Sequence, residues 1–300
     1  MIRYILLAAV VCFAHSQALA DPNPVYDALT TKGVTMPKGP PLRLPPPTMS
    51  DGLDAAAQRK ALASIADERR PVEALLKNAV SAPLVIKTGD DKASVAAGGT
   101  GKRVDVWFIV YGDLQKIVEE GFGPKDEVDP EDEPNPNDAK ITAKLLKPEE
   151  LTERRIEPLV SAGTVENYGN ADVQLFNRVR VRGTSRSVQT KTNESVTYAT
   201  MLDPRFASDK KYPNQWQSVV RDDAGKLAYG PLKPYAGLGS YFKATELKEP
   251  KGAILVEHHL VYDEPAGWFS GANVIRTKLP ILMQDNVKKL RRKLTEKEEE

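Results

Sequence analysis

Outside its first twenty residues, this chain has no cysteine. The single cysteine, Cys12, lies in a segment typical of a secretory signal. There Arg3 precedes the apolar run Ile5–Ala14, and a small-residue cleavage site follows at Ala18–Ala20. We therefore expect residues 1–20 to be a signal peptide and the mature protein to be exported, to the periplasm or the extracellular space. A mature chain without cysteine has no disulfide, no thiolate metal site and no cysteine nucleophile.

The chain also lacks a long apolar run and a surplus of charge. No segment after the signal approaches the roughly 18 apolar residues of a transmembrane helix, so we expect no integral membrane span after signal cleavage. The formal net charge is +1, and Arg3 is the only charged residue of the signal, so the mature chain is balanced. A balanced charge gives no general reason to expect a nucleic-acid partner, and we predict none.

Established catalytic motifs are absent too, including the nucleophile elbow and the helical zinc-protease motif. Two histidines remain after export, His258 and His259, adjacent in the predicted strand Ile254–Tyr262. Neighbours on a strand point to opposite faces, so the pair cannot share one metal ion. We expect no metal site, no cofactor and a non-enzymatic protein. The alternative is an enzyme that uses His258 or His259 with a nearby acid.

Prolines and acids divide the remaining chain. Residues 21–50 are rich in proline, which favours an extended tether without a packed core. Residues 51–295 are expected to form a single domain. Within it, residues 124–138 combine acids with prolines and are predicted to be an exposed insertion. Residues 296–300 are expected to form an acidic tail.

The middle of the domain shows strand patterns, with helical patterns on both sides. A helix is predicted over Gly52–Arg69 and a very hydrophobic strand over Val104–Tyr111. The segments Val173–Arg182 and Ser187–Leu202 alternate and resemble a hairpin joined by residues 183–185. We count six or seven strands, mostly antiparallel. The predicted fold class is α+β, an antiparallel β-sheet with N-terminal helices and a long C-terminal helix packed across it.

A long amphipathic helix, predicted from Phe269 to Leu294, closes the chain. Its apolar residues recur at the period of one helical face, with most of the lysines and arginines off that face. The apolar stripe consists of Leu279, Met283, Val287, Leu290 and Leu294. At about 1.5 Å per residue such a helix is roughly 35–40 Å long, so it needs a broad apolar partner.

The turn before this helix carries a resemblance. Residues Tyr262–Phe269 read YDEPAGWF and connect the last strand to the stripe. An antiparallel sheet, a D-x-P-x-G-W turn and a long closing helix resemble the START-like, helix-grip superfamily (SRPBCC type) of lipid-binding domains. The resemblance implies a hydrophobic molecule held in a tunnel between the sheet and the last helix. The exported, cysteine-free chain also fits a bacterial secreted family.

By this resemblance, the strand, the turn and the helix would line a cavity for a lipid or another hydrophobic small molecule. The expected lining residues are Val256, His258, Leu260, Tyr262, Trp268, Leu279, Met283 and Val287. The alternative is a structural or interaction module of the cell envelope, with a solid core and a protein partner.

A second candidate site is a row of arginines. Arg178, Arg180 and Arg182 alternate with valines, so on a strand they would share one face. Such a row could bind a phosphate or a carboxylate. The competing interpretation is the solvated face of an antiparallel sheet.

Overall fold

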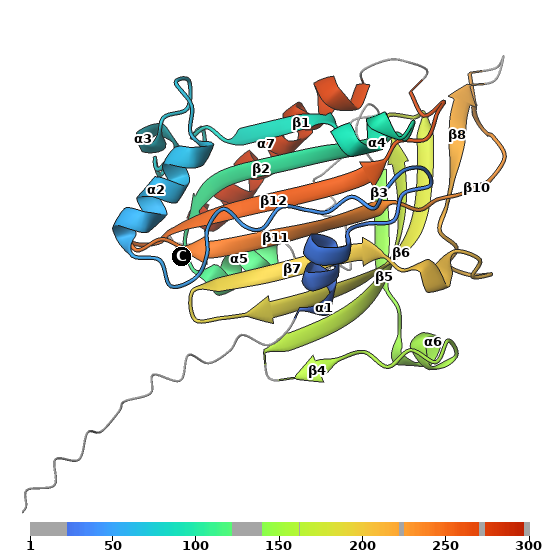
Figure 1. Ribbon diagram of the computed structural model, residues 1–300, viewed down its shortest axis with the longest axis horizontal. Coiled ribbons are helices and arrows are strands. Elements are labelled where there is room, and N and C mark those ends of the chain that lie inside the picture. Colours follow the sequence, from blue (N-terminus) through green and yellow to red (C-terminus); the bar gives the residue numbers. More distant parts are fainter. Residues whose placement is uncertain (1–22, 122–139, 162, 222–224, 270–273, 297–300) are drawn as a thin grey trace, which may run out of the picture.

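The computed structural model describes residues 23–121, 140–161, 163–221, 225–269 and 274–296 (Figure 1). The expected signal peptide and the expected acidic insertion lie outside these ranges, as does the expected tail after Glu296. One large sheet spans the molecule. In the view of Figure 1, helix α7 lies behind the sheet and the N-terminal segment crosses its front.

The sheet has 12 strands in the order β1-β2-β12-β11-β7-β6-β5-β3, with β4 on β5 and with β8 pairing with β6, β9 and β10. The strands are β1 Val85–Asp90, β2 Gly101–Tyr111, β3 Lys140–Leu145, β4 Val160–Ser161, β5 Thr164–Leu175, β6 Val179–Lys191, β7 Ser195–Leu202, β8 Gln215–Arg221, β9 Leu227–Tyr229, β10 Lys233–Pro234, β11 Leu238–Glu246 and β12 Ala253–Asp263. Their pairings are antiparallel. Strand β12 lies between β2 and β11, so early and late parts of the chain meet at its two edges.

The predicted α+β class, antiparallel sheet and C-terminal helix are confirmed, but six or seven strands is too few. The missed strands are short or polar. Strands β4, β9 and β10 have two or three residues. Strand β5 carries Glu166, Asn167, Asn170 and Asp172 where an apolar alternation would be recognised. Such segments become strands because neighbouring strands supply hydrogen-bond partners, which is a tertiary effect.

The predicted hairpin turn at residues 183–185 is wrong. The chain reverses at Phe176 and Asn177, whose φ angles of 50° and 52° are both left-handed. The Arg178 amide closes this turn on the Leu175 carbonyl at 2.9 Å, as in a type I′ turn. Gly183 lies inside β6, where a Cβ atom would come within 2.6 Å of a Leu202 methyl group. Close packing, and not a turn, therefore requires this glycine.

The helices lie on both sides of the sheet. Helix α7 (Val274–Glu296) and α5 (Leu114–Gly121) pack on one face. The others are α1 Pro24–Asp27, the π-helical turn η1 Ala28–Lys32, α2 Ala55–Ile65, α3 Val72–Leu75, α4 Lys92–Ala96, α6 Pro148–Thr152 and the 3₁₀ turn η2 Pro204–Phe206. Helix α2 is shorter than the predicted Gly52–Arg69. It begins where the Asp54 side chain accepts a hydrogen bond from the Ala57 amide.

The proline-rich N-terminal segment is not a free tether, which corrects the expectation for residues 21–50. Val25 and Leu29 are fully buried, and they pack with Leu42, Tyr241 and Val261 on the face opposite α7. The residues after η1 cross β12 and β11 in an extended conformation (Figure 1). We name residues 33–51 the strap. Apolar side chains between the prolines enter the core, and the prolines themselves leave no amide to satisfy.

Candidate ligand-binding site under the last helix

Seven of the eight predicted lining residues lie in one layer between β12 and α7. On β12 every second residue points toward α7. The seven are Val256, His258, Leu260 and Tyr262 on the strand, with Leu279, Met283 and Val287 on the helix. The eighth, Trp268, packs instead with Trp216, Tyr235 and Phe269 in a separate cluster. The chain leaves the sheet at Asp263, so this tryptophan does not continue the alternation of β12.

The two halves of α7 differ in packing. In the second half, Val287 and Leu294 are buried in the core. In the first half, Leu279 and Met283 are only partly buried, as is Leu260 on the strand. Pro280 lies in this half, where it cannot donate the usual helical hydrogen bond. We name Leu260, Leu279 and Met283 the seam. Leu290 in the second half of the helix is partly buried as well, as are Ile86 and Leu238 on the sheet.

His258 brings one polar group into this apolar layer. Its ring stacks on Phe242 with the centroids 3.7 Å apart. The Nδ1 atom is buried and makes no hydrogen bond within the part of the chain that the structure describes. Burial, followed by the charge of His259, lowers the pKa of His258 to about 3. The imidazole is therefore neutral near pH 7, with an unpaired nitrogen that can accept or donate one hydrogen bond.

Acid should destabilise the fold through His258. The unfolded histidine binds a proton at its ordinary pKa of 6.5, whereas the folded one does so only at a pKa of about 3. Stability is therefore lost as the pH falls below about 6.5, by roughly 3 kcal/mol at pH 4. Urea unfolding from pH 7 to pH 4 should show this loss, and His258→Phe should lack it. Parallel pH curves for the two proteins would contradict the assignment.

On the opposite face, His259 has the reverse environment. Its Nδ1 lies 2.6 Å from Asp105 Oδ1, and its Nε2 lies 3.4 Å from Glu257 Oε2. Burial alone would lower the pKa of His259, but the hydrogen bonds to Asp105 and Glu257 raise it. Glu257 also accepts hydrogen bonds from the Thr48 and Met49 amides, at 2.7 and 3.1 Å. His259 therefore belongs to an ion-paired network that holds the strap.

A pocket of about 300 Å³ lies beside the second half of α7 and not beneath Met283 or Val287. Arg291 lines it and donates hydrogen bonds from Nε and Nη2 to the Ile109 carbonyl at 3.0 and 2.8 Å. Strand β1 begins at Val85, opposite Trp107, so it does not extend along β2 as far as Ile109. Burial lowers the pKa of Arg291 to about 10. Arg291 thus supplies the hydrogen-bond donor that β1 does not supply at this edge of β2, and it attaches α7 to the strand.

The structure breaks up the predicted row of arginines. Arg178 lies in the turn before β6 and is exposed. Arg180 pairs with Asp172 through Nε at 2.8 Å, and the Nε atom of Arg182 lies 3.5 Å from the same carboxylate. The face expected to bind an anion thus already contains a carboxylate. Sequence spacing did not reveal it, because Asp172 comes from the neighbouring strand β5.

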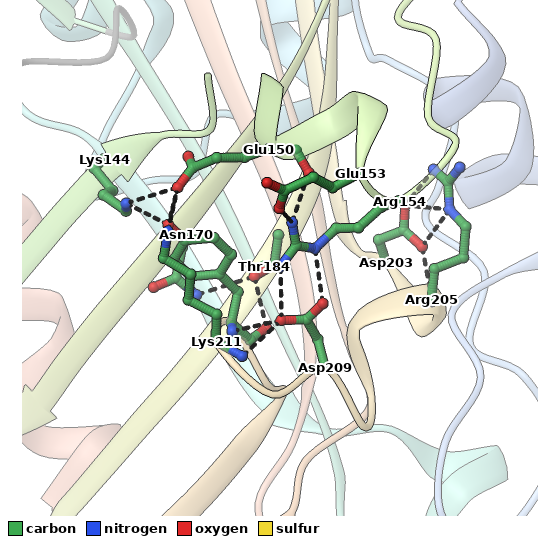
Figure 2. Close-up of polar contacts among 11 residues, drawn as sticks. Lys144, Glu150, Glu153, Arg154, Asn170, Thr184, Asp203, Arg205, Asp209 and Lys211 are labelled. Atoms are coloured by element: carbon green, nitrogen blue, oxygen red, sulfur yellow. Dashed lines mark hydrogen bonds and ion pairs between the residues drawn. The ribbon is translucent and has the colours of Figure 1, made fainter. Parts of the chain in front are cut away.

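No pattern along the chain indicated the group of polar side chains around α6 (Figure 2). Arg154 Nε lies 2.7 Å from Asp209 Oδ2, and Lys211 Nζ lies 2.7 Å from Glu150 Oε1. Beside them, Arg205 pairs with Asp203. Lysine and tyrosine hydrogen bonds hold the pKa of Glu150 below its usual range. Glu150 and Arg154 lie about fifty residues before the others, which fall between positions 203 and 211, so no local motif could have shown that they meet.

Among the helices in the described ranges, none is long and apolar enough to cross a membrane. The same residues contain no group of three or more His, Cys, Asp or Glu side chains that could hold a metal ion.

Comparisons with known proteins place few constraints on this chain. No model of a known protein family matches it, and no curated protein matches it. Among solved structures, it is similar to the human StarD13 (DLC2) lipid transfer and protein localization domain, with 9% sequence identity and a TM-score of 0.38. The alignment covers 82% of this chain and 98% of that domain. Similarity of this degree carries no argument about a ligand.

Proposed function

We propose that this protein is exported and binds a lipid or another hydrophobic small molecule between the sheet and the first half of α7. One observation carries the proposal: His258 Nδ1 is buried in the apolar layer that contains the seam, without a hydrogen bond to any residue in the described ranges. Apolar walls with one well-placed polar group are typical of small-molecule sites. The START-like resemblance of the D-x-P-x-G-W turn favours the same class of ligand.

The ligand that fits this layer is apolar and carries one hydroxyl or carbonyl group. An unpaired buried polar atom costs roughly 1–3 kcal/mol, and a single hydrogen bond from a ligand would remove that cost. Because His258 is neutral near pH 7, it offers no charge to a carboxylate. A neutral hydroxyl or carbonyl therefore suits it better than an acid.

Entry of the ligand requires the first half of α7 to move while the second half stays in place. Pro280 weakens the first half, and Leu279 and Met283 are only partly buried there. In the second half, Arg291 is bonded to the backbone of β2, and Val287 and Leu294 are buried. We expect the helix to separate from the sheet at the seam.

The test combines extraction with a matched pair of variants. Mass spectrometry of organic extracts should find a lipid in the purified protein, and the emptied protein should take up a fluorescent fatty alcohol. Met283→Trp should fill the seam and weaken uptake about tenfold or more, a loss of at least 1.4 kcal/mol. Ile281→Trp is the control, because Ile281 is 59% exposed on the same helix.

Repeatedly empty extracts and no uptake would overturn the proposal. The second candidate, a structural or interaction module with a solid core, would then take its place. The buried Val287 and Leu294 favour that candidate, as does the position of the pocket beside α7 rather than under the seam. Equal effects of the two tryptophan variants would likewise contradict a ligand at the seam.

A further inference from the structure

A second cleft, of about 520 Å³, lies on the sheet face opposite α7. Strands β5, β6 and β7 form its floor, and the 3₁₀ turn η2 forms one side. Its volume is within the range of small-molecule sites. None of the seam residues and neither histidine lines it, so it is separate from the site under α7.

Two arginines in the cleft are held in place by buried carboxylates. Arg186 binds Glu166 through Nε and Nη2, at 2.8 and 3.1 Å, and the Glu166 side chain is only 2% exposed. Arg205 binds Asp203 through Nε at 3.0 Å and through Nη2 at 2.5 Å. The Asp203 side chain is 4% exposed. Each guanidinium is therefore oriented before any ligand arrives.

Tyr168 connects the two pairs. Its hydroxyl donates to Glu166 and accepts a hydrogen bond from Arg205 Nη2 at 2.7 Å. Burial and then Glu166 raise the pKa of Tyr168 to about 12, so the hydroxyl keeps its proton. The Tyr168 hydroxyl thus contacts both the carboxylate that holds Arg186 and the guanidinium of Arg205, which brings the two arginines to one place in the cleft.

The contacts leave the same part of each arginine available. Both use Nε and Nη2 for their carboxylates, and the Nη1 atom of neither makes a hydrogen bond to a described residue. Their side chains remain 30% and 48% exposed. Two Nη1 groups in one cleft can donate several hydrogen bonds to a single oxyanion, as planar guanidinium groups commonly do.

The other walls of the cleft are apolar. Leu159 and Met201 line it with Leu202 and Pro204, and Leu159 is half exposed. The acidic Glu157 lies at the cleft as well and is exposed. Its charge acts against anions, as do the carboxylates of Glu166 and Asp203, so the Nη1 donors and not a surplus of positive charge would hold an oxyanion. The lining thus combines oriented cationic donors with an apolar surface.

We propose that this cleft binds a small organic anion, a phosphate or carboxylate attached to an apolar body, with Arg186 and Arg205 holding the oxyanion and the Leu159 wall holding the body. The inference does not depend on the proposed function, since it concerns the opposite face of the sheet.

The test uses octyl phosphate and inorganic phosphate in calorimetric titrations of the full chain. Octyl phosphate should bind, more weakly as salt rises, and at least tenfold more tightly than inorganic phosphate. Arg205→Lys keeps a positive charge beside Asp203 but lacks the planar fork, and should weaken binding about tenfold. Arg178→Lys is the matched control, because Arg178 is exposed outside the cleft.

A second variant keeps the test decisive if Arg205→Lys folds poorly. Leu159→Trp should obstruct the cleft and weaken octyl phosphate binding, whereas Val160→Trp should not, since Val160 is 79% exposed and does not line it. Absence of binding, or equal binding by both tryptophan variants, would overturn the proposal. Equal affinity for inorganic and octyl phosphate would contradict the part of the proposal in which the Leu159 wall binds an apolar body. A loss of binding in Met283→Trp would instead locate the ligand at the seam.

Discussion

Replacing Glu257 with glutamine should lower the free energy of unfolding by about 3–5 kcal/mol, the cost of breaking a buried ion pair from one side. The Glu257 side chain is fully buried and faces His259. It accepts hydrogen bonds from the backbone amides of Thr48 and Met49. A glutamine has one acceptor oxygen, and its NH₂ group would face either an amide donor or the imidazole. The variant leaves buried donors without acceptors.

The same substitution should loosen the strap. Other contacts there are Lys243, which donates to the Met49 carbonyl at 3.0 Å, and Tyr241, which donates to the Pro45 carbonyl at 2.8 Å. Trypsin should cut after Arg43 faster in Glu257→Gln than in the parent, and urea unfolding should give the stability difference. The exposed Glu246, replaced by glutamine, is the control. Unchanged cleavage and unchanged unfolding would show that the carboxylate does not hold the strap.

The effect of Glu257→Gln on stability should also depend on pH, because Glu257 contacts His259. Since the folded pKa of His259 is raised, its contribution is fully present below the ordinary pKa of 6.5 and is lost as the pH rises through the folded value. In Glu257→Gln one of the two carboxylates that raise this pKa is gone. The decline of stability above pH 6.5 should therefore be smaller than in the parent protein.

Replacing Arg291 with methionine should also lower the free energy of unfolding by about 3–5 kcal/mol. Several buried carbonyl oxygens lose their hydrogen-bond donor, at roughly 1–3 kcal/mol each. Besides Ile109, the guanidinium binds the Ala82 and Val80 carbonyls through Nη1, at 2.5 and 3.3 Å. A methionine of similar length keeps the apolar contacts but donates nothing. The helix would then lose its Arg291 hydrogen bonds to β2 and to the segment before β1.

Urea unfolding of Arg291→Met would give the loss, and amide hydrogen exchange would locate it. Exchange should accelerate in the second half of α7 and in residues 108–111 of β2. Arg292→Met is the matched control, since Arg292 is exposed on the next position of the helix. If the two variants were equally stable, the hydrogen bonds of Arg291 would contribute nothing measurable.

Strong local patterns predicted their elements well. The stripe of α7 repeats at a helical period, and β2 and β12 are rich in apolar residues, so each carries its own local signal. The strap shows the opposite case. Its prolines indicated an extended chain, which it is, but not that Leu42 and Met49 would be buried on the sheet. Extended conformation is a local property, whereas burial depends on a partner surface formed by strands far along the chain.

In the candidate sites, too, residue order determined some features and the tertiary structure decided the others. Alternation along a strand is a property of the backbone, so residue order alone placed His258 and His259 on opposite faces and Val256, Leu260 and Tyr262 beside His258. It could not show that one imidazole would lie among apolar residues, with its Nδ1 atom unpaired by any described residue, while its neighbour lies between two carboxylates. Asp105 reaches His259 from a distant strand, and the amides of Thr48 and Met49 reach Glu257 from the strap. Likewise Arg186 meets Glu166, and Arg291 meets Ile109, through the pairing of strands and the packing of a helix, because side chains distant in sequence become neighbours only when the whole sheet assembles.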